Sequence, residues 1–234
     1  MISKYKALKS SYKFWEIHNT AKGFPENYPD EEVVRFLMRL KSKAKILKKK
    51  IKDFKVLDLG SGSGKNVKPV IDIGFSLYCI DWSKGGINYI KNKHKNKKID
   101  YKCLDFINNQ LPYKNNYFDA VIATSIFDHI FKEDSQTLLK DAHRVLKENG
   151  VMISNLMTTK TNKKNRKGEK ITDEKNTYLV KSGNSAGEIH SLFEKDNAKK
   201  FFSKYFQTKE LVDYNILYNQ KENLNVFYYH LKKI

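Results

Sequence analysis

The sequence predicts an α/β fold with a Rossmann-like, seven-stranded, mostly parallel sheet and helices on both faces. Three observations predict it. Short apolar segments ending in glycine or aspartate recur along the chain, segments with helical spacing separate them, and a glycine-rich turn follows the first apolar segment. Alternating strands and helices form parallel sheets, and right-handed connections bring the loops after the strands to one edge. Because ligands of such folds bind at that edge, we expect the functional site there.

The chain length and composition predict one globular domain. Its 234 residues are 40% hydrophobic, enough to bury a core. We expect an N-terminal segment over 1–30 and the main domain over 31–234, interrupted by an insertion at about 157–189. Apolar runs are too short to span a membrane. Cys79 and Cys103, the only cysteines, are expected to be buried thiols. They form no disulfide framework or zinc pattern, so we predict no metal site and a cytoplasmic location.

The net charge of +19 comes almost entirely from lysine, since Arg35, Arg39, Arg144 and Arg166 are the only arginines. Arginine is the preferred bidentate partner of phosphates and guanine. The lysines are also scattered along the chain. A solvated basic surface is therefore favoured, and a polyanionic partner stays open as the alternative. Nothing in the sequence indicates an oligomeric state.

The expected elements follow in order. Segment 1–29 is aromatic and basic, and Pro25 and Pro29 predict an irregular end. A helix is expected over 31–49, capped by Asp30. Strands are expected at 54–60, 75–81, 99–105, 117–124 and 150–156, with helices near 66–73, 83–94 and 134–147. Asn149 and Gly150 are expected to stop the last of these helices. A helix at 196–206 and two closing strands, 209–217 and 224–233, complete the chain.

The segment 56–64, VLDLGSGSG, is the most informative motif. A dinucleotide-binding turn requires G-x-G-x-x-G, but Lys65 stands where the third glycine would fall. A phosphate-binding P-loop requires a first glycine and a final Ser or Thr, where this chain has Leu59 and Asn66. The motif instead resembles the S-adenosylmethionine (SAM)-binding motif of class I methyltransferases. The resemblance covers residues 54–156, including the segments 111–130 and 144–156.

That resemblance implies SAM as the cofactor. Asp58 and the glycine turn would hold the methionine part, and Asp81 would accept hydrogen bonds from the ribose hydroxyls. Trp82 would cover the adenine, since aromatic faces stack on bases. The full expected set is Asp58, Gly60, Gly62, Gly64, Asp81, Trp82, Asp105, Phe106 and Thr124.

On the substrate side, the sequence predicts transfer to an oxygen. The fourth strand ends in Ala123-Thr124-Ser125-Ile126, without the Asn-Pro-Pro-Tyr motif typical of amino-group methylation. His190 is the leading candidate for a general base, with His129 and Asp128 as further catalytic candidates. The expected substrate-binding residues are Trp15, His18, Tyr28 and Arg35. The first two belong to a segment that we expect to form a lid.

The predicted function is methyl transfer to a small polar, anionic metabolite. The N-terminal region through YPDEEVVRFL (28–37) resembles that of methyltransferases in bacterial surface-polysaccharide pathways, including capsule synthesis. This resemblance implies a sugar or a phosphorylated or phosphoramidate precursor as substrate. Two alternatives remain open: an RNA or ribosome-associated methyltransferase, favoured by charge, and a non-catalytic SAM-binding protein.

Overall fold

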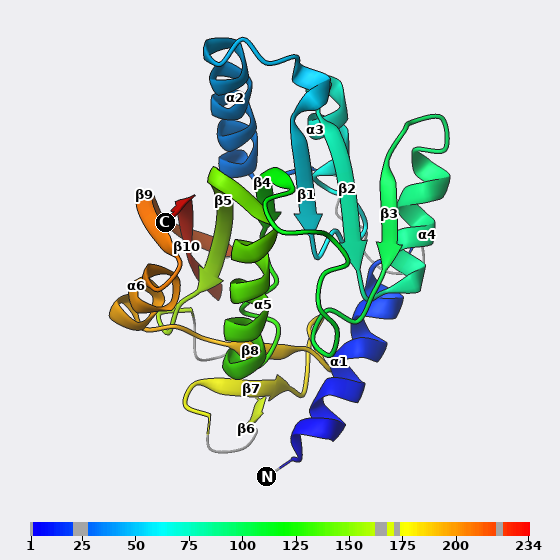
Figure 1. Cartoon of the computed structure of the whole chain (residues 1–234). Coiled ribbons are helices and arrows are strands. Elements are labelled where there is room, and N and C mark those ends of the chain that lie inside the picture. The colour runs from blue at the N-terminus through cyan, green and yellow to red at the C-terminus, as the bar shows by residue number, and fades with distance from the viewer. Residues whose placement is uncertain (1, 21–27, 162–167, 171–173, 219–221) are drawn as a thin grey trace.

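The computed structural model describes residues 2–20, 28–161, 168–170, 174–218 and 222–234. Figure 1 shows the chain as one body with a central sheet. Its helices are α1 (Lys4–His18), α2 (Glu31–Ile46), a 3-10 turn (Ile51–Asp53), α3 (Val67–Ile73), α4 (Lys84–Lys93), α5 (Lys132–Val145) and α6 (Lys195–Ser203). Its strands are β1 (Lys55–Leu59), β2 (Ser76–Asp81), β3 (Asp100–Cys103), β4 (Phe118–Ala123), β5 (Leu146–Met157), β6 (Gly168–Lys170), β7 (Thr177–Val180), β8 (Ile189–Ser191), β9 (Phe206–Tyr218) and β10 (Glu222–Lys233).

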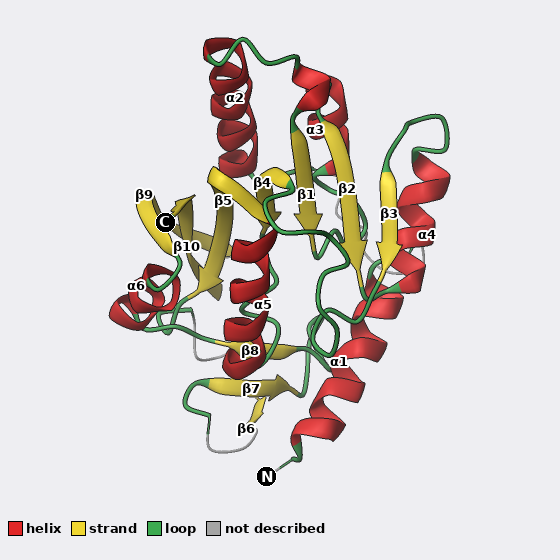
Figure 2. Cartoon of the chain, in the orientation of Figure 1, coloured by secondary structure: helices red, strands yellow, loops and turns green. Residues whose placement is uncertain are grey.

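The central sheet has seven strands in the order β3-β2-β1-β4-β5-β10-β9. Strands β1 to β5 are parallel, whereas β10 runs antiparallel to both β5 and β9. The order reverses between β1 and β4, and the carboxyl ends of these strands point the same way in Figure 2. The predicted mostly parallel, seven-stranded sheet is confirmed. The switch in strand order marks the expected ligand edge.

Helices cover both faces of the sheet because successive strand residues point to opposite sides. In β1, Leu57 and Leu59 pack in the same core cluster as residues of α5 and α6. Val56, which precedes Leu57 and points to the opposite side, packs with residues of α2 and α3 on the other face. A strand buried on both faces reads as a continuous apolar run, which is why 54–60 was recognisable as a strand.

Helix α2 is amphipathic, as its sequence pattern predicts. In α2, Val33, Leu37 and Leu40 are buried, whereas Arg35 and Arg39 on the outer face pair with glutamates. No helix in the described part of the chain is both long and apolar enough to cross a membrane.

Three local expectations were wrong. Helix α5 ends at Val145, before Asn149, because Leu146 already pairs with Phe118 in the sheet. Asn149 does adopt a left-handed conformation, but within β5. Asp30 occupies the N-cap of α2, yet its carboxylate caps no backbone N–H and instead lies 3.4 Å from Lys65 Nζ. Cys79 is buried as expected, whereas Cys103 is exposed on the outermost parallel strand β3.

A small sheet and α1 lie at the carboxyl edge of the main sheet (Figure 1). The small sheet, in the order β6-β7-β8, is built by the described part of the predicted insertion. Ser191 ties it to the loop after β4, since its N–H donates to Asp128 O and its hydroxyl to Ile130 O. Ala7 of α1, Leu179 and Ile189 form a separate apolar cluster there. The N-terminal helix α1 and the segment after β5 therefore meet at the expected ligand edge.

Candidate active site

A pocket opens at the carboxyl ends of β1, β2 and β4. Its walls come from the glycine turn after β1, the residues that end β2 and β4, and the C-terminal end of α1. The predicted residues that line it are Trp15, His18, Gly60, Gly62, Asp81, Trp82, Phe106, Thr124 and His129. Residues far apart in sequence thus converge at the switch in strand order, as expected for a parallel sheet.

The glycine turn forms the floor of this pocket. Gly60 has φ 72°, a left-handed conformation that side chains with a Cβ rarely adopt. A Cβ there would also lie 2.8 Å from Ile126 Cδ1. Gly64 ends the turn outside the pocket, where it packs against Ile90. The turn therefore brings backbone, and no side chain, to the ligand surface at Gly60.

Asp81 is held at the end of β2 by two backbone amides. Gly62 N–H donates to its Oδ2 and Ser83 N–H to its Oδ1, both at 2.8 Å. Burial raises the pKa of this carboxyl to about 6, against the lowering effect of those amides. It lines the pocket while only 5% exposed. Fixed in this way, the carboxylate can accept ligand hydroxyls without first losing side-chain freedom.

Asp58 lies one residue before the end of β1 and is buried. Asn66 donates to its Oδ1 at 3.2 Å, and its Oδ2 has no hydrogen-bond partner among the described residues. Burial raises the pKa of Asp58 to about 7, and the Asn66 hydrogen bond and the Lys65 charge only partly offset that effect. The structure places Asp58 beneath the turn and outside the pocket lining, next to Asn66, which does line it.

The raised pKa of Asp58 predicts the pH dependence of stability. Because folding raises the pKa of Asp58, the folded protein favours the protonated carboxyl. The corresponding contribution to stability is complete below the ordinary pKa near 4 and is lost as the pH rises towards 7. Asp58→Asn removes the ionisation, so the ligand-free variant should gain about 2–4 kcal/mol over the parent protein at pH 8 and almost nothing at pH 4. Urea unfolding at both pH values measures this.

Asp119→Asn is the matched control for that measurement. The Asp119 carboxylate accepts hydrogen bonds from Lys49, Lys147 and the Lys55 backbone, which outweigh burial and lower its pKa. Its loss should destabilise the protein at pH 8 and matter less at pH 4, the opposite sign to Asp58. Equal unfolding free energies for Asp58→Asn and the parent at pH 8 would contradict the assignment.

An aromatic wall closes one side of the pocket. Trp82 stacks on Phe106 with ring centroids 5.3 Å apart, and Tyr12 of α1 contacts the Trp82 ring edge-on at 4.4 Å. Such pairs fix the ring planes through packing. Trp82 and Phe106 both line the pocket, so the predicted adenine-side residues are brought together.

The two remaining predicted cofactor residues behave differently. Thr124 lines the pocket, and its buried hydroxyl has no hydrogen-bond partner among the described residues. Asp105 lies outside the pocket lining, with its carboxylate engaged by the backbone N–H groups of Ile107 and Asn108. Asp105 therefore shapes the turn after β3, and its position does not support the contact with the cofactor that was expected of it.

The substrate side is formed by α1 and the loop after β4. Trp15 and His18 line the pocket, and the Trp15 indole meets the His129 imidazole edge-on at 5.1 Å. Asn19 and Ile126 also line it but were not predicted. Asn19 follows directly on the last residue of α1, a helix whose placement the sequence could not give.

Tyr28 and Arg35 do not reach the pocket. Tyr28 is 86% exposed, and Arg35 lies on the outer face of α2, paired with Glu31 and Glu32. An acidic first turn in its own helix captures Arg35, so it does not bind at the site. The expectation that these two residues bind substrate is corrected.

The predicted catalytic residues lie together, but only His129 lines the pocket. The ring centroids of His190 and His129 lie 5.4 Å apart, and Glu188 Oε2 lies 2.6 Å from His190 Nε2. His190 itself does not line the pocket. Asp128 is buried and accepts a hydrogen bond from Met157 N–H. Among the predicted catalytic residues, His129 thus replaces His190 as the one that lines the pocket. Glu188 was not predicted, because nothing in its local sequence marks it.

The pocket fits the cofactor implied by its motif. Five buried polar atoms of its lining residues have no hydrogen-bond partner in the described structure: His18 Nδ1, Ser61 Oγ, Asn66 Oδ1, Thr124 Oγ1 and His129 Nδ1. Asp81 offers carboxylate oxygens, and the glycine turn offers an approach to backbone. SAM has hydroxyl, ammonium and carboxylate groups that such partners can bind. Its adenine matches the Trp82–Phe106 wall.

Comparison with known proteins agrees with this geometry. Residues 57–154 match the family model described as "Methyltransferase domain". The ubiquinone biosynthesis O-methyltransferase of Pelagibacter ubique is 34% identical over 107 residues, 45% of this chain and 42% of that protein. An uncharacterised protein of Methanocaldococcus jannaschii is 30% identical over 157 residues, 63% of this chain and 60% of that protein. The chain spans about half the length of these curated relatives.

Solved structures show the same fold. A SAM-dependent methyltransferase of Methanosarcina mazei has a TM-score of 0.67 and 17% identity, over 81% of this chain and 97% of that one. The N-methyltransferase NodS of Bradyrhizobium japonicum, solved with S-adenosylhomocysteine (SAH), has a TM-score of 0.62 and 11% identity, over 95% and 97% of the two chains. Fold, motif and family match agree: residues 57–154 match a methyltransferase domain, and the sheet that contains them has the fold of solved SAM-dependent methyltransferases.

Proposed function

We propose that the protein transfers the methyl group of SAM to an oxygen of a small polar molecule. The observation that carries the proposal is a single pocket lined both by the SAM-motif residues Gly60 and Asp81 and by the His129 imidazole. Alignment of donor and acceptor in such a pocket can contribute about 7–11 kcal/mol to lowering the barrier. When bound, SAM supplies an electrophilic methyl carbon on a sulfonium.

An oxygen acceptor is favoured on two grounds. The segment after β4, Thr124-Ser125-Ile126, lacks the motif typical of amino-group methylation. The Pelagibacter relative carries O-methyltransferase in its name, and its 34% identity spans part of both chains. A hydroxyl must lose its proton as the methyl group arrives, and His129 is, with His18, one of the two imidazoles that line the pocket. Asp81 would bind and orient the donor.

Among oxygen acceptors we favour anionic metabolites, such as sugars and phosphorylated or phosphoramidate precursors of surface polysaccharides. The support is the resemblance of the N-terminal region and one lysine of the pocket lining, Lys65. Arg35 no longer contributes, because it pairs with Glu31. Lys65 lines the pocket and has Asp30 as its ion-pair partner, so an anionic acceptor would bind in competition with that carboxylate.

The proposal predicts SAH release that depends on a small acceptor. The full chain, supplied with SAM and a panel of catechols, sugars, sugar phosphates and phosphoramidates, should release SAH with at least one hydroxyl-bearing compound. Mass spectrometry should locate the added methyl on oxygen. Because the net charge of +19 favours nucleic acid, total RNA belongs in the panel. Transfer to RNA alone would replace this substrate class, and tight SAM binding without any transfer would indicate a non-catalytic SAM-binding protein.

A further inference from the structure

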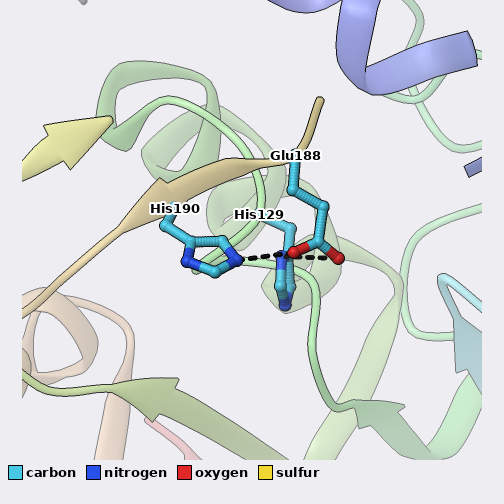
Figure 3. A group of neighbouring side chains, drawn as sticks. All are labelled: His129, Glu188 and His190. Atoms are coloured by element: carbon cyan, nitrogen blue, oxygen red, sulfur yellow. Dashed lines mark hydrogen bonds and ion pairs between the residues drawn. The ribbon is translucent and has the colours of Figure 1, made fainter. Parts of the chain in front are cut away.

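We infer that His129, Glu188 and His190 form a binding site for one divalent transition-metal ion at the wall of the SAM pocket. One nitrogen or carboxylate oxygen from each residue lies within 4.8 Å of the others (Figure 3). Glu188 directly precedes β8 and His190 lies within it. Because residues two apart in an extended chain point the same way, both side chains can face the same side of β8. The His129 side chain comes from the loop after β4, and Ser191 joins these two segments through hydrogen bonds.

The electrostatics of the three side chains suit a cation. Glu188 is only 5% exposed, and a carboxylate so buried requires a positive partner. Its nearest basic neighbours are His129, with Nδ1 4.0 Å from Glu188 Oε1, and His190, with Nε2 2.6 Å from Glu188 Oε2. A divalent ion held between these three side chains would supply the positive charge that the buried carboxylate requires.

One donor atom of the cluster lacks a hydrogen-bond partner. His129 Nδ1 is buried and has none within the described residues, yet it lies 4.0 Å from Glu188 Oε1. On the other side of the ring, Asp128 Oδ1 lies 3.7 Å from His129 Nε2 and is also unpartnered there. A carboxylate behind a metal-bound histidine fixes its tautomer and ring orientation. Asp128 is thus a positioning residue that would direct Nδ1 toward the ion.

The donor set selects the class of metal. Two imidazoles and one carboxylate are the protein ligands of catalytic zinc sites that keep a fourth position open, and they also hold ferrous iron. Magnesium and calcium prefer all-oxygen sets. Metal–ligand bonds of about 2.0–2.2 Å place the donor atoms roughly 3–3.5 Å apart. Small side-chain rotations achieve this spacing, exchanging the 2.6 Å Glu188–His190 contact for two bonds to the ion.

The metal ion would bind and orient the acceptor hydroxyl, and this step rests on the proposed function. His129, as a ligand of the ion, would then not itself act as the base. His129 lines the pocket, so the open coordination position would face the cofactor side. A hydroxyl bound to the ion is acidified, as metal-bound water is, whose pKa falls to about 7. Its proton leaves to solvent, the oxygen–carbon bond forms as the carbon–sulfur bond breaks, and the electron pair of the broken bond stays on sulfur. The acceptor class implied is a hydroxyl compound.

Metal titration of the full chain tests the site. After treatment with a chelator, calorimetry with Zn²⁺ should show one ion per chain, and Co²⁺ should give visible absorption of a low-symmetry complex. His129→Ala and His190→Ala should each weaken binding at least 100-fold. His143→Ala is the matched control, because His143 lies on α5 and contacts Ile234 O, and it should bind as the parent does. Glu188→Gln keeps the side-chain shape and should also lose the ion.

Other outcomes separate the two proposals. No stoichiometric Zn²⁺ or Co²⁺ binding, or binding unchanged in both histidine variants, overturns the metal site. SAH release that continues undiminished in chelator, without metal binding, leaves the methyltransferase function standing and indicates that Glu188 only orients His190. Stoichiometric metal binding with no SAH release from any acceptor would leave the site standing and overturn the function. Circular dichroism and thermal unfolding of each variant verify that it folds.

Discussion

Asp81→Ala is expected to weaken SAM binding by about 5- to 150-fold, the equivalent of roughly 1–3 kcal/mol for charge-assisted hydrogen bonds. The carboxylate is preorganised by Gly62 and Ser83 at 2.8 Å, so the folded protein has already overcome the cost of ordering it. Calorimetry with SAM and with SAH measures the loss. Both ligands contain the ribose, so the two should weaken together.

Asp105→Ala is the matched control, because both aspartates follow strands of the same sheet edge. Its carboxylate is occupied by Ile107 and Asn108 and lies outside the pocket lining, so SAM affinity should stay within a factor of about three. Asp81→Asn keeps the shape and one acceptor oxygen, and should fall between the other two variants. Unchanged affinity in Asp81→Ala, with thermal unfolding still cooperative, would remove Asp81 from the cofactor site.

The difference between these two aspartates shows how far sequence reasoning reaches. Both were predicted as acids at strand ends, with roles implied by the family resemblance, and strand ends converge at one edge in a parallel sheet. The turn that follows each strand decides which carboxylate faces the pocket. After Asp81 the chain enters α4 through Ser83, whereas Asp105 starts a turn that uses its own side chain as a cap. Periodicity and motif spacing carry no information about that choice.

The fold itself was accessible because its signals are local. The strand 55–59 is buried on both faces, so its run of apolar residues identifies it. The turn after it requires a left-handed residue, so its glycines identify it. Arg35 was wrongly assigned to the substrate site, because the sequence does not show whether a positive side chain faces a ligand or an acidic neighbour such as Glu31. The cluster of His129, Glu188 and His190 depends on packing between β8 and the loop after β4. Long-range contacts of this kind leave no periodic pattern.

Helix α1 is the element that the sequence placed least well. Its aromatic residues were expected to form a lid over 1–30, but they follow no strand or motif that fixes a position. In the structure Tyr12 contacts Trp82, Glu16 accepts a hydrogen bond from Gly85 N–H, and Trp15 lines the pocket. We propose that α1 closes the pocket after SAM enters. Residues 1 and 21–27 of the expected lid lie outside the described residues.

Trp15→Ala is expected to accelerate SAH dissociation by about 10- to 100-fold, since a large apolar side chain contributes roughly 1.5–3 kcal/mol when buried. The indole contacts the imidazoles of His18 and His129, so its removal opens the pocket to solvent at the acceptor side. Stopped-flow fluorescence, with excess SAM as the competitor, measures the rate.

The chain contains two tryptophans, so any Trp15 variant leaves Trp82 as the sole indole reporter, inside the pocket. Trp15→Phe therefore reports through the same fluorophore as Trp15→Ala while keeping an aromatic cover, and its SAH dissociation rate should stay close to that of the parent. Tyr5→Ala removes an aromatic ring that is 75% exposed on the same helix, and should change nothing. If Trp15→Ala and Trp15→Phe release SAH at the same rate, α1 does not close the pocket through Trp15, because the two variants differ only in that cover.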